Sequence, residues 1–173
     1  MKKSTLAVIL LFLGFYLNAQ SIYTPEYSLT LPGTPTVNEE QVVTEAGTAL
    51  IKMYQVLHEG SLILMLDSTY PNELNISASE EVALKILKNS KEGSIQNLAS
   101  QLGQTAIVIK EESTLFQDKL TALHSVSKVG PYYAVVYNFA KKHKLFSILV
   151  FSETLEKAEN VSSGIKSSFK FRT

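Results

Sequence analysis

The chain has 173 residues with 16 basic and 16 acidic side chains, and it contains no cysteine. Without cysteine it cannot form disulfides, use a thiol nucleophile, build a cysteine-ligated zinc site or carry a lipid on an amino-terminal cysteine. Its balanced charge provides no basic field for nucleic acid or anionic lipid, so we expect no nucleic-acid partner.

The amino terminus has the charged, apolar and small-residue order of a secretory signal peptide. Two lysines precede an apolar run over residues 6–17, and the small and polar residues 18–21 follow it. The run is too short for a membrane span, which needs about 20 apolar residues. We predict cleavage after Ala19. Cleavage after Ser21 is the alternative, because it places Ala19 at the third-last position, where signal peptidase needs a small side chain.

Residues 20–173 are then expected to form a single exported domain. Removing residues 1–19 deletes two of the 16 basic residues and none of the 16 acidic ones, so 14 positive charges face 16 negative ones. No remaining segment is long and apolar enough to span a membrane. We therefore expect a soluble periplasmic or secreted protein. The lack of disulfides favours a bacterial source, and the junction at residues 18–20 resembles signal peptides of the Bacteroidota.

The domain is predicted to open with short antiparallel strands. Residues 27–31 alternate with period two and stop at a Pro-Gly pair, and residues 32–40 are expected to form a loop. Strands over residues 41–45 and 48–57 flank an Ala-Gly turn, and the second pairs with residues 61–66 in another hairpin.

A long helix is predicted after this first block. Ser77 is expected to cap it, with Glu80 as its partner in a capping box. Gly93 interrupts the helix, at a cost of roughly 1 kcal/mol relative to alanine, and can kink it. Gly103 ends it. One apolar stripe recurs at helical spacing and comprises Val82, Ile86, Leu87, Ile95, Leu98 and Leu102.

Four more strands and a closing helix complete the predicted order. The strands cover residues 106–110 (or 106–116), 120–126, 132–139 and 145–151. Their joints have hairpin length, so neighbouring strands should be antiparallel. The closing helix is marked by apolar residues at helical spacing between Leu155 and Ile165.

Three features together resemble the PsbP-like superfamily: the stretch YSLTLPGTP at residues 27–35, the long central helix, and the closing GIKSSFKF at residues 164–171. This group also includes the Ran-binding Mog proteins and the periplasmic DcrB proteins. The resemblance implies an α+β fold, with an antiparallel sheet of about seven or eight strands sandwiched by the central and carboxyl-terminal helices. It also implies that the closing Ser-Phe docks the last helix, and it implies a fold far more than a function.

No motif for catalysis, metal binding or phosphate binding is present. His58 and His143 fall in predicted turns, and His124 is expected to be a half-buried strand residue with a local hydrogen-bond partner rather than a metal ligand. No Gly-x-Ser-x-Gly turn and no glycine-rich phosphate loop is found. We predict no catalytic residues, no metal site and no cofactor.

Tyrosines on the predicted strand at residues 132–139 are the candidate binding residues. Tyr133 and Tyr137 share one face of this strand, and Tyr132 faces the other way. Tyrosine is common both in sheets and at interfaces, so these side chains either cover the sheet or bind a partner where a face is left open.

The sequence therefore predicts an exported, non-catalytic binding or accessory module with a protein partner in the cell envelope. Two alternatives stay open. One is a carrier that holds a small apolar ligand between sheet and helix. The other is a hydrolase whose catalytic residues are dispersed along the chain.

Overall fold

Two antiparallel sheets make up the β part of the protein. The computed structural model describes residues 19–44, 47–74 and 79–172, so the predicted signal segment up to residue 18 lies outside the described residues. The larger sheet contains β3 (Thr36–Thr44), β4 (Gly47–His58), β5 (Ser61–Thr69), β6 (Ala106–Phe116), β7 (Leu120–Val129), β8 (Tyr132–Lys141) and β9 (Lys144–Ser152). The smaller sheet contains β1 (Gln20–Tyr23), β2 (Tyr27–Leu31) and β10 (Lys170–Phe171).

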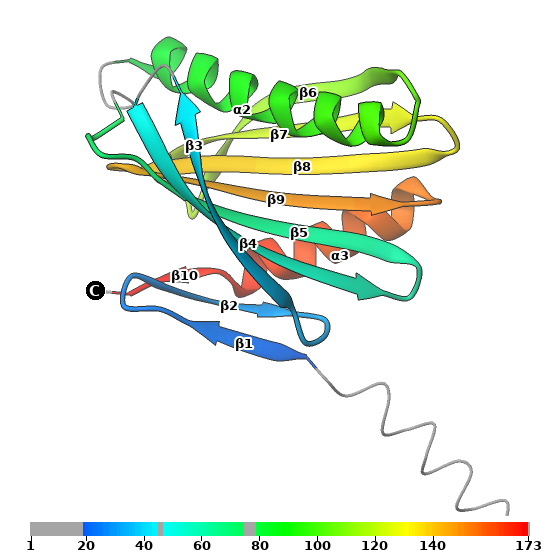
Figure 1. The fold of residues 1–173 in the computed structure, drawn as a ribbon, viewed down its shortest axis with the longest axis horizontal. Coiled ribbons are helices and arrows are strands. Elements are labelled where there is room, and N and C mark those ends of the chain that lie inside the picture. The colour runs from blue at the N-terminus through cyan, green and yellow to red at the C-terminus, as the bar shows by residue number, and fades with distance from the viewer. Residues whose placement is uncertain (1–18, 45–46, 75–78, 173) are drawn as a thin grey trace, which may run out of the picture.

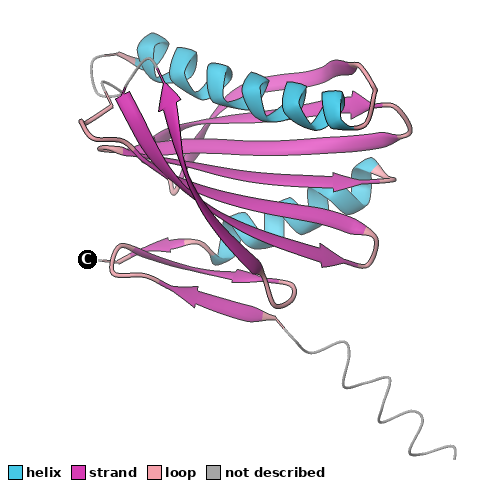
Figure 2. Ribbon diagram, viewed as in Figure 1, coloured by secondary structure: helices cyan, strands magenta, loops and turns pink. Residues whose placement is uncertain are grey.

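The larger sheet has seven strands in the order β3-β4-β5-β9-β8-β7-β6, and the smaller one has the order β1-β2-β10. Helix α2 (Glu80–Gln101) packs on β6, β7 and β8, whereas α3 (Leu155–Ser168) packs on β8, β9 and β2. The two helices lie on opposite faces of the large sheet (Figures 1 and 2). The predicted α+β fold, with an antiparallel sheet of about seven or eight strands between two helices, is confirmed.

An aromatic core fills the space between α3, the small sheet and the large sheet. Phe116 and Phe139 stack with their ring centroids 3.9 Å apart, and Phe169 meets Phe139 edge to face at 5.0 Å. Phe169 follows α3 directly and is 1% exposed. The hydroxyl of Ser168 accepts a hydrogen bond from the backbone N–H of Thr30 over 2.9 Å. The predicted docking of the last helix by its closing Ser-Phe is thus confirmed.

Two local predictions about the chain are wrong. Residues 32–40 are not a loop throughout, because β3 begins at Thr36. Most side chains of this edge strand are exposed and polar, so the alternation that reveals half-buried strands is missing. The cap of α2 is Ser79, whose hydroxyl accepts from Val82 N over 3.2 Å, and Ser77 lies outside the described residues.

The buried stripe of α2 also differs from the predicted one. Its buried residues are Ala83, Leu87, Lys91, Ile95 and Ala99, and Leu102 is 43% exposed. Gly93 does not end the helix, which continues to Gln101. Among the described residues, no helix is long and apolar enough to cross a membrane.

Candidate functional site

A shallow groove runs beside α3 on the aromatic-core face of the large sheet. It arises because α3 packs mainly on β8 and β9, which leaves part of β6 and β7, around Glu112 and His124, accessible on this face. Two adjoining hollows of 330 Å³ and 410 Å³ form it, and both are lined by Tyr137 and Lys166. We call this feature the α3 groove. Its other principal lining residues are Glu112 and Leu115 of β6, His124 of β7 and Glu159 of α3.

Tyr137 forms the floor of the α3 groove. Its hydroxyl donates a hydrogen bond to the carbonyl oxygen of Leu115 over 3.3 Å, and Lys166 Nζ lies 4.7 Å from its ring centroid. At this distance the ammonium group is attracted by the face of the ring. Burial raises the pKa of Tyr137. The phenol therefore stays protonated at neutral pH, and because only 3% of Tyr137 is exposed, the residue closes the bottom of the α3 groove and positions Lys166 rather than acting as a base.

A charged wall lies opposite α3. Glu112 Oε1 is 3.0 Å from His124 Nδ1 and 2.8 Å from Lys110 Nζ. These hydrogen bonds, first that of Lys110 and then that of His124, lower the pKa of the Glu112 carboxyl. His124 is half-buried and has a local partner, as its strand position predicted. This side of the α3 groove thus presents a carboxylate held by two basic groups.

The other candidate tyrosine does not line the α3 groove. Tyr133 points to the same face of β8 as Tyr137, but its neighbour is Lys128, whose Nζ lies 5.8 Å from its ring centroid. Tyr132 faces the opposite side and packs on Phe151, with 4.7 Å between ring centroids. The predicted faces of the three tyrosines are therefore confirmed, but only Tyr137 contributes to the hollows.

Comparisons with known proteins bear on the fold. No family model matches the chain, and no curated protein matches it. Among solved structures, the solution structure of cyanobacterial PsbP (CyanoP) from Synechocystis sp. PCC 6803 is similar, with a TM-score of 0.56. The match covers 90% of this chain and 93% of the CyanoP chain, at 14% sequence identity. The protein has a PsbP-like fold.

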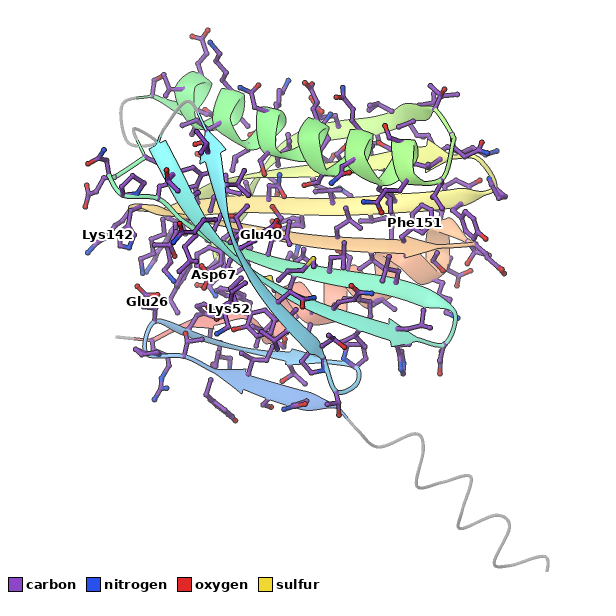
Figure 3. All side chains as sticks on the ribbon, in the orientation of Figure 1. Glu26, Glu40, Lys52, Asp67, Lys142 and Phe151 are labelled. Atoms are coloured by element: carbon purple, nitrogen blue, oxygen red, sulfur yellow. The ribbon has the colours of Figure 1, made fainter. Side chains whose placement is uncertain are left out.

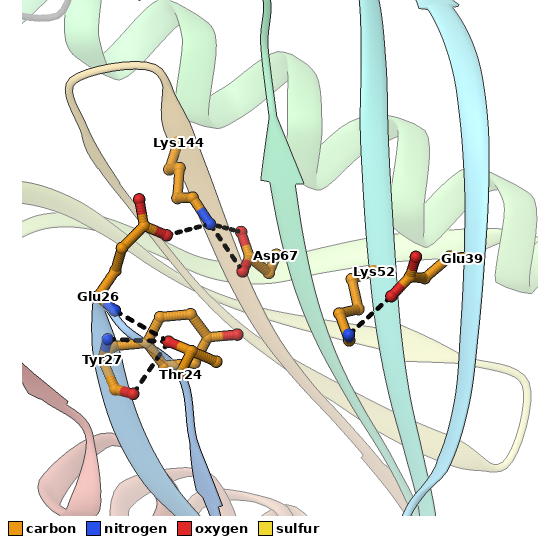
Figure 4. Close-up of polar contacts among 7 residues, drawn as sticks. All are labelled: Thr24, Glu26, Tyr27, Glu39, Lys52, Asp67 and Lys144. Carbon is orange, nitrogen blue, oxygen red and sulfur yellow. Dashed lines mark hydrogen bonds and ion pairs between the residues drawn. The ribbon is translucent and has the colours of Figure 1, made fainter.

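A second polar cluster ties the small sheet of this PsbP-like fold to the large one (Figure 4). Lys144 Nζ lies 3.1 Å from both carboxylate oxygens of Asp67 and 2.5 Å from Glu26 Oε2. Burial acts to lower the pKa of Lys144, but the hydrogen bond with Glu26 and the charge of Asp67 outweigh it and raise the pKa. Lys144 thus bridges β9, β5 and the residue preceding β2, which gives this cluster a structural role.

The remaining histidines lie apart from the α3 groove. His58 ends β4, with Nε2 3.9 Å from Glu59 Oε1, and His143 lies in the turn between β8 and β9. Within the described ranges, no group of three or more His, Asp or Glu side chains is placed to hold a metal ion.

Sequence reasoning missed Lys166 and Glu112 as groove residues. Lys166 lies on the closing helix, within the stretch that carries the fold resemblance, and Glu112 lies in an adjacent acidic pair, but neither belongs to a motif for binding or catalysis. The usable signal was the amphipathic pattern of the closing helix, which places Lys166 directly after the buried Ile165 and so at the edge of the helix's contact with the sheet.

Proposed function

We propose that the protein is an exported, non-catalytic binding or accessory module that holds a protein partner of the cell envelope in the α3 groove. The supporting observation is the pairing of Tyr137 with Lys166 on the floor of an open, largely polar groove. The buried ring of Tyr137 holds Lys166 at the edge of the groove, opposite the Glu112 carboxylate, so that the groove offers both signs of charge to a partner surface. We further propose that the mature protein is periplasmic or secreted and that its source is a member of the Bacteroidota.

The two alternative functions gain no support from the structure. An apolar carrier would need room between α3 and the sheet, and the rings of Phe116, Phe139 and Phe169 pack together there. A hydrolase would need a nucleophile beside a base, and the hydrogen-bond partner of His124 among the described residues is the carboxylate of Glu112 rather than a hydroxyl group.

Site-specific photo-crosslinking in the native envelope tests the proposed function. A photoreactive residue at Ser163, which is exposed and lines the α3 groove, should form a discrete covalent adduct with a partner protein. The same residue at Glu156, exposed on α3 but outside the α3 groove, is the matched control and should give no adduct. Lys166→Glu should weaken the Ser163 adduct. Equal labelling from both positions, or none from Ser163, would contradict the proposal.

A further inference from the structure

The half of the large sheet that α2 does not cover carries a row of apolar side chains. On the α2 side, α2 packs on β6, β7 and β8, and β4 and β5 lie beyond it (Figure 1). Leu57, at the end of β4, is 76% exposed, and the other members are half-buried. We call this surface the open leucine face; it comprises Ile51, Met53 and Leu57 of β4 and Leu62, Leu64 and Leu66 of β5, with the exposed polar Gln55 between Met53 and Leu57.

The residue pattern of β4 and β5 is that of strands covered on both sides. An antiparallel strand with one solvated face normally alternates apolar and polar residues. In β5, Ile63 and Met65 are 0% exposed in the aromatic-core face, yet Leu62, Leu64 and Leu66 on the other face are also apolar. The neighbouring edge strand β3 is mostly polar and exposed, as expected for a solvated strand. We therefore expect the open leucine face to be buried against another molecule.

The charges around this face restrict what can cover it. The side chains that β3, β4 and β5 direct to this side include a single charged residue, Glu40, which is labelled in Figure 3. Lys88 and Lys91 of α2 both reach Glu111 on β6, so they lie on the flank of α2 away from this face. An anionic lipid surface is recognised through clustered basic residues, and this face has none.

A second copy of the chain meets these requirements. In a twofold-symmetric dimer the same surface of both copies is buried, so the surface must be complementary to itself. Two nearly uncharged apolar faces can pack together without a like-charge penalty, and the apolar contact removes both from water. A heterologous partner of strong charge would find no complementary group here.

We propose that the protein forms a symmetric homodimer through the open leucine face. The α3 groove lies on the opposite face of the same sheet, so it stays accessible in both copies. The dimer therefore presents two α3 grooves. A partner with two copies of its binding segment would bind the dimer more tightly than it binds a single groove, because its second contact is intramolecular. The dimer itself does not depend on the function proposed for the α3 groove.

The mass of the mature protein (residues 20–173) in solution tests this proposal. Sedimentation equilibrium from micromolar to millimolar concentration should give a two-chain mass. Gln55 is an exposed residue of β4 on the open leucine face, so Gln55→Arg can be accommodated in the monomer and should raise the dimer Kd about 100-fold. Leu50→Arg, at a residue of the same strand on the opposite face that is 44% exposed, is the matched control and should leave the Kd unchanged.

A charge-swap mixture separates an interface effect from a folding effect. Gln55→Glu alone should also weaken the dimer. An equal mixture of the Gln55→Arg and Gln55→Glu variants should form dimers again, because the two contacting faces then carry opposite charges. A one-chain mass at millimolar concentration would overturn the proposal. So would an unchanged Kd in Gln55→Arg, or a one-chain mass with an acyl lipid or a peptide retained in native mass spectrometry.

Discussion

The ammonium group of Lys91 on α2 lies 2.8 Å from Glu111 Oε2 on β6, and the Lys91 side chain is only 4% exposed. This buried lysine separates two apolar contacts of α2 with the sheet. Leu87 packs in one cluster, and Ile95 and Ala99 pack in another. Between them, the sheet presents four buried polar side chains. The hydroxyls of Ser125, Ser127 and Ser147 and the Oδ1 atom of Asn138 have no hydrogen-bond partner among the described residues. The middle of α2 therefore lies on a polar part of the sheet.

Removing the carboxylate should destabilise the protein far more than removing the lysine. Glu111→Gln leaves the buried ammonium group with only the exposed carboxylate of Glu92, 4.0 Å away, and we expect a loss of about 2–3 kcal/mol in the free energy of unfolding. Lys91→Met keeps the apolar stem and leaves Glu111 paired with Lys88 at 2.9 Å, so the loss should stay below about 1 kcal/mol. Urea unfolding of both variants measures the difference. A larger loss in Lys91→Met than in Glu111→Gln would refute this assignment.

The same pair makes stability depend on pH in the acid range. Hydrogen bonds from Lys91 and then Lys88 lower the pKa of the Glu111 carboxyl. Since the pKa is lower in the folded state, the stabilisation is fully present above the unfolded glutamate value of about 4.3 and is lost as pH falls through the folded value. Thermal unfolding should show a constant Tm difference between the native chain and Glu111→Gln above about pH 5. The difference should vanish toward pH 2. A difference that persists there would show that Glu111 stabilises by another route.

The two carboxylates around Lys144 should differ in importance. The Asp67 side chain is 7% exposed and the Glu26 side chain is 48% exposed. Asp67→Asn weakens a buried pair, and we expect a loss of about 1–3 kcal/mol in stability. Glu26→Gln removes a solvent-screened partner and should cost less than about 1 kcal/mol. Chemical denaturation of the two variants checks the ranking, and an equal or reversed order would be inconsistent with it.

Truncation of the closing phenylalanines should give unequal effects. Phe169 is 1% exposed and contacts Tyr27, Phe116, Phe139 and Phe146 through its ring. Phe169→Ala should destabilise by about 3–5 kcal/mol, because it opens a cavity in the aromatic core. Phe171 is only half-buried, so Phe171→Ala should cost about 1–2 kcal/mol. Similar losses in the two variants would indicate that β10, rather than the Phe169 ring, secures the end of α3.

The alternation of residues 27–31 sufficed to place a strand because every second side chain is fully buried. Residues 132–139 form a largely apolar run without such alternation, since β8 is buried on both faces. The first half of the edge strand β3 was predicted as loop, and only residues 41–45 were placed in a strand, because most β3 side chains are exposed. The short strands β1 and β10 escaped prediction, since their pairing with β2 depends on segments such as Lys170 with the distant Ser28. The separate small sheet is therefore a product of tertiary contacts rather than of local pattern.

The candidate site was predictable only in part for a similar reason. The period of two placed Tyr137 on a face shared with Tyr133. Whether that face is covered depends on where α3 crosses the sheet, and the local residue pattern of β8 does not indicate the position of α3. The approach of Lys166 to Tyr137 joins residues of two elements whose relative position is set by packing of the aromatic core.

The start of β1 favours one amino terminus for the mature, exported form that we propose. β1 begins at Gln20 and pairs with β2 through Gln20 with Leu31 and Ser21 with Thr30, and the last two hydroxyls are 3.3 Å apart. Cleavage after Ala19 preserves the whole strand, whereas cleavage after Ser21 removes these two pairs. Intact mass measurement of the exported protein should therefore show a chain that begins at Gln20. A recombinant chain that begins at Ile22 should be less stable than one that begins at Gln20 by about 1 kcal/mol, owing to lost backbone hydrogen bonds. An exported chain that begins at Ile22 would assign the cut to Ser21 instead.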